Sequence, residues 1–204
     1  MKKYLKAEED LDFIPIMPLN EADGDGAEIE VPESLSLLPL RNTVLFPGVV
    51  LPITVGRDKS IKAVNDGYRG EKLIGVVAQK DSTIEDPQAK DLEDIGTVAK
   101  IIKQIQMPDG GTTIIIQGKT RFVIDSVISE EPYFKAKTSA LKDEEMVTDP
   151  DFDAYVSNIK DIATEIIQLS PNIPSEASIA IKNIESTSFL INFISSNMNA
   201  DVPV

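Results

Sequence analysis

The sequence predicts an α+β fold, with an antiparallel β lobe that closes or half-closes as a barrel, followed by a small all-helical lobe. Three observations predict it. Short apolar and β-branched runs alternate with turn signals between residues 34 and 142. Only one segment of that region, residues 58–68, has helical spacing. From residue 143 to residue 204, apolar residues instead recur every three or four positions.

Seven runs are predicted as strands of the β lobe. Pro52 interrupts the second run, so this strand is expected at a sheet edge or a bulge. The stretch Met107-Pro108-Asp109-Gly110-Gly111 predicts a hairpin, because proline presets φ and Asp-Gly supplies positive φ. Asp58 is expected to cap the single helix. The runs, in order, are residues 36–40, 49–55, 73–79, 97–107, 112–117, 121–129 and 133–141.

The helical lobe is predicted from a change of period. A long amphipathic helix is expected to begin at Pro150 and to end at Ser170-Pro171. Two shorter helices follow, over residues 174–184 and from Ser186 or Thr187 onward. The last one keeps many apolar residues close to position 204, which indicates a fragment of a longer protein. A complete two-lobe protein remains the alternative.

Residues 1–33 form an acidic segment that is expected to be disordered. They carry ten Asp and Glu residues and three lysines, so half of the net charge of −14 lies in about a sixth of the 204 residues. The part from Glu21 to Glu30 has no periodicity and little to bury. Its Asp-x-Asp-Gly pattern lacks the remaining ligands of a calcium loop. The apolar island Leu11–Met17 is the part of this segment that is expected to dock elsewhere.

The residue types that are absent exclude several kinds of chemistry. The chain has no cysteine and no histidine, so disulfides, thiolate nucleophiles, Ser-His-Asp triads and the usual zinc sites are excluded. The acidic net charge argues against sequence-independent binding to nucleic acid and to an anionic membrane surface. Because there is neither a signal-peptide pattern nor a run of about 20 apolar residues, the chain is expected in the cytoplasm.

Three local patterns are similar to catalytic motifs, and each has a simpler structural explanation. Gly118-Lys119-Thr120 matches the end of a P-loop, but Thr113 replaces the first glycine and β-type sequence flanks it, so a turn is expected. Ser157 and Lys160 have Ser-x-x-Lys spacing inside the predicted long helix, without companion motifs. The carboxylates between Glu85 and Asp94 are expected on an exposed loop. Surface charge explains them better than the acid–base chemistry of a small hydrolase.

Six apolar residues beside turns are candidates for contact with a partner. Large apolar side chains on loops can form a patch that binds other proteins or unfolded chains. The alternative for each one is that it folds back onto the end of the barrel. The candidates are Phe46, Pro47, Met107, Pro108, Tyr133 and Phe134.

Several blocks, taken in order, give the chain a resemblance to a known family. These are Leu38-Pro39-Leu40-Arg41-Asn42 with Phe46-Pro47-Gly48-Val49, then Gly56-Arg57, Ile74-Gly75-Val76-Val77 and Gly96-Thr97-Val98-Ala99-Lys100-Ile101, followed by Gly118-Lys119-Thr120-Arg121-Phe122 and Leu169-Ser170-Pro171-Asn172-Ile173-Pro174. From about residue 34 to residue 201, the sequence resembles the N-terminal domain of Lon proteases, most of all those of Bacteroides-type bacteria.

The resemblance implies a PUA-like β pseudo-barrel with a helical lobe, which selects and holds unfolded or damaged protein substrates. It implies a longer parent that is a hexameric, ATP-dependent serine protease, with ATP and Mg bound downstream. No catalytic, cofactor-binding or metal-binding residue carries over to this chain. The alternative is a stand-alone Lon-type module that binds one specific ligand or partner. The motif positions that carry over as fold-defining are Pro39, Arg41, Gly48, Gly56, Gly75, Gly96, Gly118 and Arg121.

Overall fold

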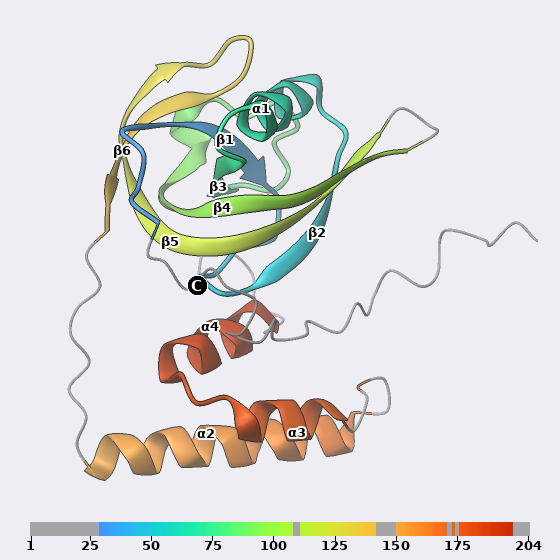
Figure 1. Cartoon of the computed structure of the whole chain (residues 1–204), viewed down its shortest axis with the longest axis vertical. Coiled ribbons are helices and arrows are strands. Elements are labelled where there is room, and N and C mark those ends of the chain that lie inside the picture. The colour runs from blue at the N-terminus through green and yellow to red at the C-terminus, as the bar shows by residue number, and fades with distance from the viewer. Residues whose placement is uncertain (1–28, 108–110, 142–149, 171–172, 174–175, 198–204) are drawn as a thin grey trace, which may run out of the picture.

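The computed structural model describes residues 29–107, 111–141, 150–170, 173 and 176–197. Its mixed sheet and helices confirm the predicted α+β class. Figure 1 shows the strands curled around one core, with a helix against the barrel and the helical lobe beneath it. The elements are β1 (Ser34–Leu40), β2 (Val50–Val55), α1 (Asp58–Arg69), β3 (Leu73–Gln79), the 3-10 helix η2 (Ala89–Asp91), β4 (Leu92–Gln106), β5 (Thr112–Ser129), β6 (Lys135–Ala140), α2 (Pro150–Leu169), α3 (Glu176–Asn183) and α4 (Thr187–Asn197).

Five of the strands close into a ring. The pairings run β5–β4–β3–β1–β6, and β6 pairs again with β5. The long β5 makes this closure possible, because its first half pairs with β2 and its second half with β6. β2 has β5 as its one partner strand among the described residues. Pro52 lies in β2, which confirms the predicted edge position of a residue that has no N–H to donate.

One pairing corrects the expectation of a wholly antiparallel barrel. β1 and β3 run parallel, with Leu38 beside Val76 and Leu40 beside Ala78. A parallel pair needs a long crossover connection, and here β2 and α1 both lie between the two strands. The remaining pairings are antiparallel.

The turn predicted at Gly118–Thr120 is also wrong, because β5 runs through it without a break. Ala99 pairs with Gly118 and Val98 with Thr120, so Lys119 is the extra residue of a β-bulge. A side chain at Gly118 would collide with the carbonyl oxygen of Phe46. The glycine therefore marks the place where the loop after β1 lies directly against the strand, not a chain reversal.

Glycines also make room for the largest buried side chain of the barrel. Phe122 is fully buried, in a cluster with residues such as Leu37. A Cβ at Gly75 would lie 2.9 Å from the Phe122 ring, and a Cβ at Gly96 would lie 2.6 Å from it. Two neighbouring strands thus lack side chains where the ring from β5 fills the space. A second buried cluster surrounds Ile74 and extends under α1.

The helix ends agree only in part with the predictions. Ser186 caps α4, since its Oγ accepts a hydrogen bond of 3.2 Å from the Phe189 N–H. Asp58 does not cap α1. It is the first helical residue, and the N-cap position belongs to Arg57, whose side chain makes no capping bond. Asp58 can still act favourably on the helix dipole from the first turn.

The helical lobe contacts the barrel through α4. The Asn192 side-chain amide donates to the Pro47 carbonyl oxygen at 3.2 Å, and Arg121 donates to Asn192 Oδ1 at 3.2 Å. Gly48 has a φ of +81°, and a Cβ there would lie 2.6 Å from the Phe189 ring. The predicted motif positions Gly48 and Arg121 therefore meet α4 at one junction.

Folded contacts begin before the predicted boundary at residue 34. Val31 packs against the Phe122 cluster, and the Thr138 N–H donates to the Glu33 carbonyl oxygen at 3.0 Å. The Thr138 hydroxyl also donates to the Pro32 carbonyl oxygen. Residues 31–33 therefore make contacts with the β lobe, although the prediction placed them in the disordered segment. Residues 1–28 lie outside the described part of the chain.

Two truncations measure this contribution. Removal of residues 1–33 is expected to cost about 2 kcal/mol more than removal of residues 1–28, because it deletes two hydrogen bonds and an apolar contact. This difference corresponds to a melting temperature lower by about 4–8 °C. Differential scanning calorimetry of both truncations checks it. Equal melting temperatures would show that residues 29–33 add nothing to stability.

Candidate functional surfaces

Two arginines lie where β1 ends and α1 begins. Arg41 follows β1 and Arg57 precedes α1, and the crossover between β1 and β3 brings the two together. Both line two adjoining cavities, which we call the smaller cavity, of about 420 Å³, and the larger cavity, of about 640 Å³. Ser60 and Pro39 line both as well. We call the two cavities together the arginine cleft.

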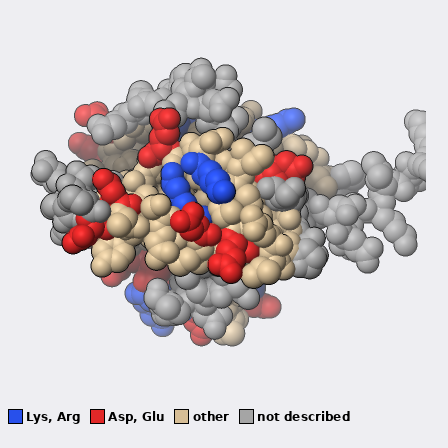
Figure 2. Space-filling model, turned by 90° about the horizontal axis from the view of Figure 1, so that it is seen from below, with Lys and Arg blue, Asp and Glu red and all other residues tan. Residues whose placement is uncertain are grey.

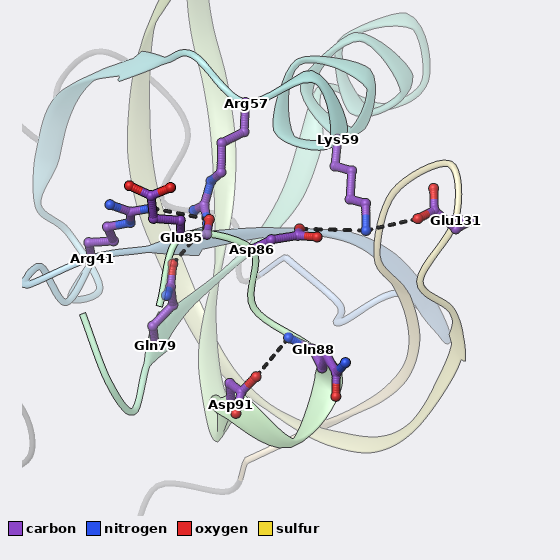
Figure 3. Close-up of polar contacts among 9 residues, drawn as sticks. All are labelled: Arg41, Arg57, Lys59, Gln79, Glu85, Asp86, Gln88, Asp91 and Glu131. Atoms are coloured by element: carbon purple, nitrogen blue, oxygen red, sulfur yellow. Dashed lines mark hydrogen bonds and ion pairs between the residues drawn. The ribbon is translucent and has the colours of Figure 1, made fainter. Parts of the chain in front are cut away.

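Hydrogen bonds fix the position of Arg57 in this cleft (Figure 3). Its Nη1 donates to Gln79 Oε1 at 3.0 Å and to the Glu85 carbonyl oxygen at 3.2 Å, and its Nη2 donates to the Pro39 carbonyl oxygen at 2.9 Å. Arg41 donates to the same Glu85 carbonyl oxygen at 3.1 Å. One loop carbonyl is therefore held by both guanidinium groups, and Arg57 is held at three points.

Gln79 connects Arg57 to the loop between β3 and β4. It is 2% exposed at the end of β3. Its Nε2 donates to the carbonyl oxygens of Ile84, at 3.0 Å, and Asp81, at 3.3 Å. In the same loop, hydrogen bonds from the Thr83 hydroxyl and N–H lower the pKa of the Asp81 carboxyl group. A single buried amide thus joins a strand, a loop and an arginine.

The two cavities differ in charge. Arg41 and Arg57 are the charged residues that line the larger cavity. The smaller cavity has Asp58, Glu85 and Asp86 in addition, together with Lys59. Lys59 Nζ lies 3.6 Å from Asp86 and 2.8 Å from Glu131 Oε1, as Figure 3 shows. The larger cavity is therefore positive, and the smaller one is balanced.

Burial lowers the pKa of Arg57, and the nearby charge of Arg41 lowers it further, whereas Asp86 raises it. The guanidinium group stays charged despite this, because arginine is not deprotonated in proteins. Two positive charges thus lie close together in the cleft.

The five predicted apolar contact residues that lie in the described part of the chain do not form one surface. Phe46 and Tyr133 are half-buried against the Ile74 cluster, and burial raises the pKa of the Tyr133 phenol. Phe134 is 3% exposed within the Phe122 cluster, so it is a core residue. Pro47 lies at the junction with α4. Met107 is 40% exposed beside the β4–β5 hairpin, and Pro108 lies outside the described residues.

An exposed apolar stripe on α2 is the feature that the sequence reasoning missed. Its residues are exposed by between 37% and 76%. Figure 2 shows the molecule from below, with much uncharged surface around a small group of basic side chains and scattered acidic ones. We call the set the α2 stripe; it consists of Tyr155, Ile159, Ile162, Ile166 and Leu169.

The spacing of the α2 stripe is 4, 3, 4 and 3 residues, the repeat of a helix that packs against another helix. The sequence analysis predicted one long amphipathic helix and did not separate this stripe from a neighbouring one. The neighbouring stripe consists of Val156, Ala163 and Ile167. That second stripe belongs to one apolar cluster with residues of α3 and α4, and α2 lies against α3. The sequence could have indicated this exposed surface, because α2 carries two separate stripes of apolar residues. A small helical lobe can cover only one of them.

The described residues offer neither a metal-binding cluster nor a membrane-spanning helix. They contain no group of three Asp or Glu residues placed to hold a metal ion. No described helix has both the length and the apolar character that a membrane crossing needs.

Among the glycines predicted to define the fold, Gly56 has open space where a side chain would lie. No neighbouring atom therefore requires a glycine at this position.

The sequence matches the model of one family over most of its length. The family is described as the ATP-dependent protease La (LON) substrate-binding domain, and the match covers residues 34–204. The chain is 53% identical to the Lon protease of Flavobacterium johnsoniae over 196 residues, which cover 96% of this chain and 24% of that protein. It is 49% identical to the Lon protease of Cytophaga hutchinsonii, in a match that covers 95% of this chain and 24% of that protein. The chain thus spans about a quarter of these relatives.

Solved structures show the same fold at low sequence identity. The N-terminal domain of the Mycobacterium avium complex Lon protease superposes with a TM-score of 0.55 at 16% identity, covering 81% of this chain and all of that one. The Lon N-terminal domain protein of Xanthomonas campestris gives a TM-score of 0.51, also at 16% identity, covering 81% of this chain and 98% of that one.

Proposed function

Because the chain belongs to the family of ATP-dependent protease La (LON) substrate-binding domains, we propose that it binds exposed apolar segments of unfolded or damaged proteins. In this proposal the domain holds such segments for ATPase and Ser-Lys protease modules that follow it in a longer protein. The relatives are Lon proteases about four times as long as this chain, which supports the proposal. Catalysis, ATP and Mg belong to those modules, and no residue of this chain takes part in the reaction.

The α2 stripe is the observation that carries the proposal. A solvent-exposed row of five large apolar side chains is unfavourable unless something covers it part of the time. From Tyr155 to Leu169 the row is about 21 Å long, at 1.5 Å of rise per residue. This length suits an apolar segment of a partner chain that lies along the helix. Binding there needs only apolar contacts, so it is expected to tolerate many substrate sequences.

Assembly is expected to make weak binding sufficient. We propose that the parent protein is a hexamer in the cytoplasm, so that six domains surround one entrance. Once one domain holds a substrate, the others meet it at a high effective concentration. Each domain can then bind weakly and release readily. The acidic net charge fits protein partners and gives no reason to expect nucleic-acid binding by this domain.

Fluorescence anisotropy tests the proposed function. The probe is labelled, reduced and alkylated α-lactalbumin, which cannot refold, with the native protein as its counterpart. Ile162→Asp is expected to weaken binding of the unfolded probe at least tenfold, because it places a charge in the centre of the α2 stripe. Native α-lactalbumin should not bind.

The control variant is Ile128→Asp. Ile128 is 51% exposed on β5 and Ile162 is 49% exposed on α2, so the two substitutions change similar surfaces. The control is expected to stay within twofold of the unchanged chain, with equal melting temperatures for all three proteins. Equal loss of binding in both variants would reject the α2 stripe as the binding surface.

A further inference from the structure

The arginine cleft contains hydrogen-bond donors without acceptors among the described residues. A guanidinium group has five N–H donors. Arg57 donates three hydrogen bonds and Arg41 donates one, which leaves two donors on Arg57 and four on Arg41. Arg57 is half-buried and fixed in place, so its remaining donors point in set directions. Such a preformed pair of cations is suited to a carboxylate, which accepts hydrogen bonds from arginine in pairs.

The walls of the larger cavity are suited to an extended peptide. Leu38, Leu51 and Ile53 line it with apolar surface, and Thr43 and Thr54 add hydroxyl groups. β2 forms one wall, and the side of β2 away from β5 has no strand partner among the described residues. A peptide in an extended conformation can lie along such an edge and place alternate side chains into the cavity.

We propose that the larger cavity of the arginine cleft binds an extended segment of another polypeptide in which a carboxylate stands beside apolar residues. The carboxylate accepts hydrogen bonds from Arg41 and Arg57, and the apolar residues contact the wall formed by β1 and β2. The inference rests on the proposed function and adds a substrate class to it. The domain then has two binding surfaces, the α2 stripe for apolar segments and the cleft for acidic–apolar segments.

The acidic charge of the whole chain does not oppose this. The residues that line the larger cavity include no carboxylate. The three carboxylates of the smaller cavity include Asp86, which lies 3.6 Å from Lys59. Charges farther away are screened, because the Debye length is about 8 Å at physiological ionic strength. The local field at the two guanidinium groups therefore decides which ligand charge is accepted.

Three labelled ten-residue peptides test the inference with the full chain. They share one apolar sequence and differ at a single central position, which is Asp, Asn or Lys. Anisotropy titrations of the unchanged chain are expected to give a Kd for the Asp peptide at least tenfold lower than for the Asn peptide. The Lys peptide should bind more weakly than either. The Asp preference should shrink when NaCl is raised from 50 to 500 mM.

Two matched variants locate the effect. Arg41→Gln should remove most of the Asp preference, and it should leave the fold intact, because Arg41 makes one hydrogen bond from an exposed position. Arg69→Gln removes the same charge at the other end of α1 and should keep the preference. Equal Kd values for the Asp and Asn peptides would overturn the inference. The inference would also be overturned if Arg41→Gln kept the preference for the Asp peptide, or if Arg41→Gln and Arg69→Gln reduced that preference equally.

The outcome is separable from that of the proposed function. Ile162→Asp should weaken binding of unfolded α-lactalbumin and leave the Asp preference of the peptides unchanged. If that variant loses unfolded-protein binding while the peptides show no preference, the cleft inference fails and the proposed function stands. If the unchanged chain binds neither unfolded protein nor peptide, the proposed function itself fails.

Discussion

Replacement of Phe122 with alanine is expected to lower the free energy of unfolding by about 3–5 kcal/mol. The ring is fully buried and belongs to β5, the strand that joins the two sides of the barrel. Its neighbours on β3 and β4 are Gly75 and Gly96, which have no side chains to move into the space it leaves. Because the cavity cannot collapse, the loss should lie toward the upper end of this range.

Urea unfolding followed by circular dichroism at 25 °C measures this loss. The control is Tyr155→Ala, which removes an aromatic ring that is 69% exposed on α2. It should change the free energy of unfolding by less than about 0.5 kcal/mol. A loss below about 1.5 kcal/mol for Phe122→Ala would show that the strands around the ring do close in, contrary to the packing described for the two glycines.

The sequence predicted the elements better than their pairing. Runs of apolar residues placed β3 at residues 73–79 without error, because this strand is buried along its length. The parallel pairing of β1 with β3 left no local trace, since it depends on how the chain crosses between them. The continuity of β5 was missed because a bulge at Lys119 and a turn both favour the same residues, glycine followed by polar groups.

The candidate surfaces were harder to predict, because exposure is a property of the assembled fold. Phe134 follows a proline and a turn, yet it is buried by the cluster around Phe122, a residue on another strand. Apolar spacing on α2 shows that two stripes exist, but only the size of α3 and α4 decides which one is covered. The arginine cleft joins Arg41 and Arg57, which become neighbours only through the crossover to β3.

Replacement of Gln79 with methionine is expected to lower the free energy of unfolding by about 2–4 kcal/mol. Methionine has a similar length and volume, so little cavity forms. The loss comes from polar groups left without partners inside the protein, at about 1–3 kcal/mol for each buried one. These are the Ile84 carbonyl oxygen and an Arg57 N–H, both of which bond to the Gln79 amide at 3.0 Å.

The matched control is Gln104→Met. Gln104 is half-buried and donates one hydrogen bond, of 2.9 Å, to Asn65 on α1. Its replacement should cost about 1 kcal/mol or less. Urea unfolding compares the two variants, and hydrogen exchange at the Lys80 N–H, which bonds to the Asp91 carbonyl oxygen, reports on the loop. Exchange there should quicken in Gln79→Met alone. Equal costs for both variants would mean that Arg57 and the loop hold their positions without the buried amide. The backbone of β1 and α1 would then be sufficient to fix the shape of the arginine cleft.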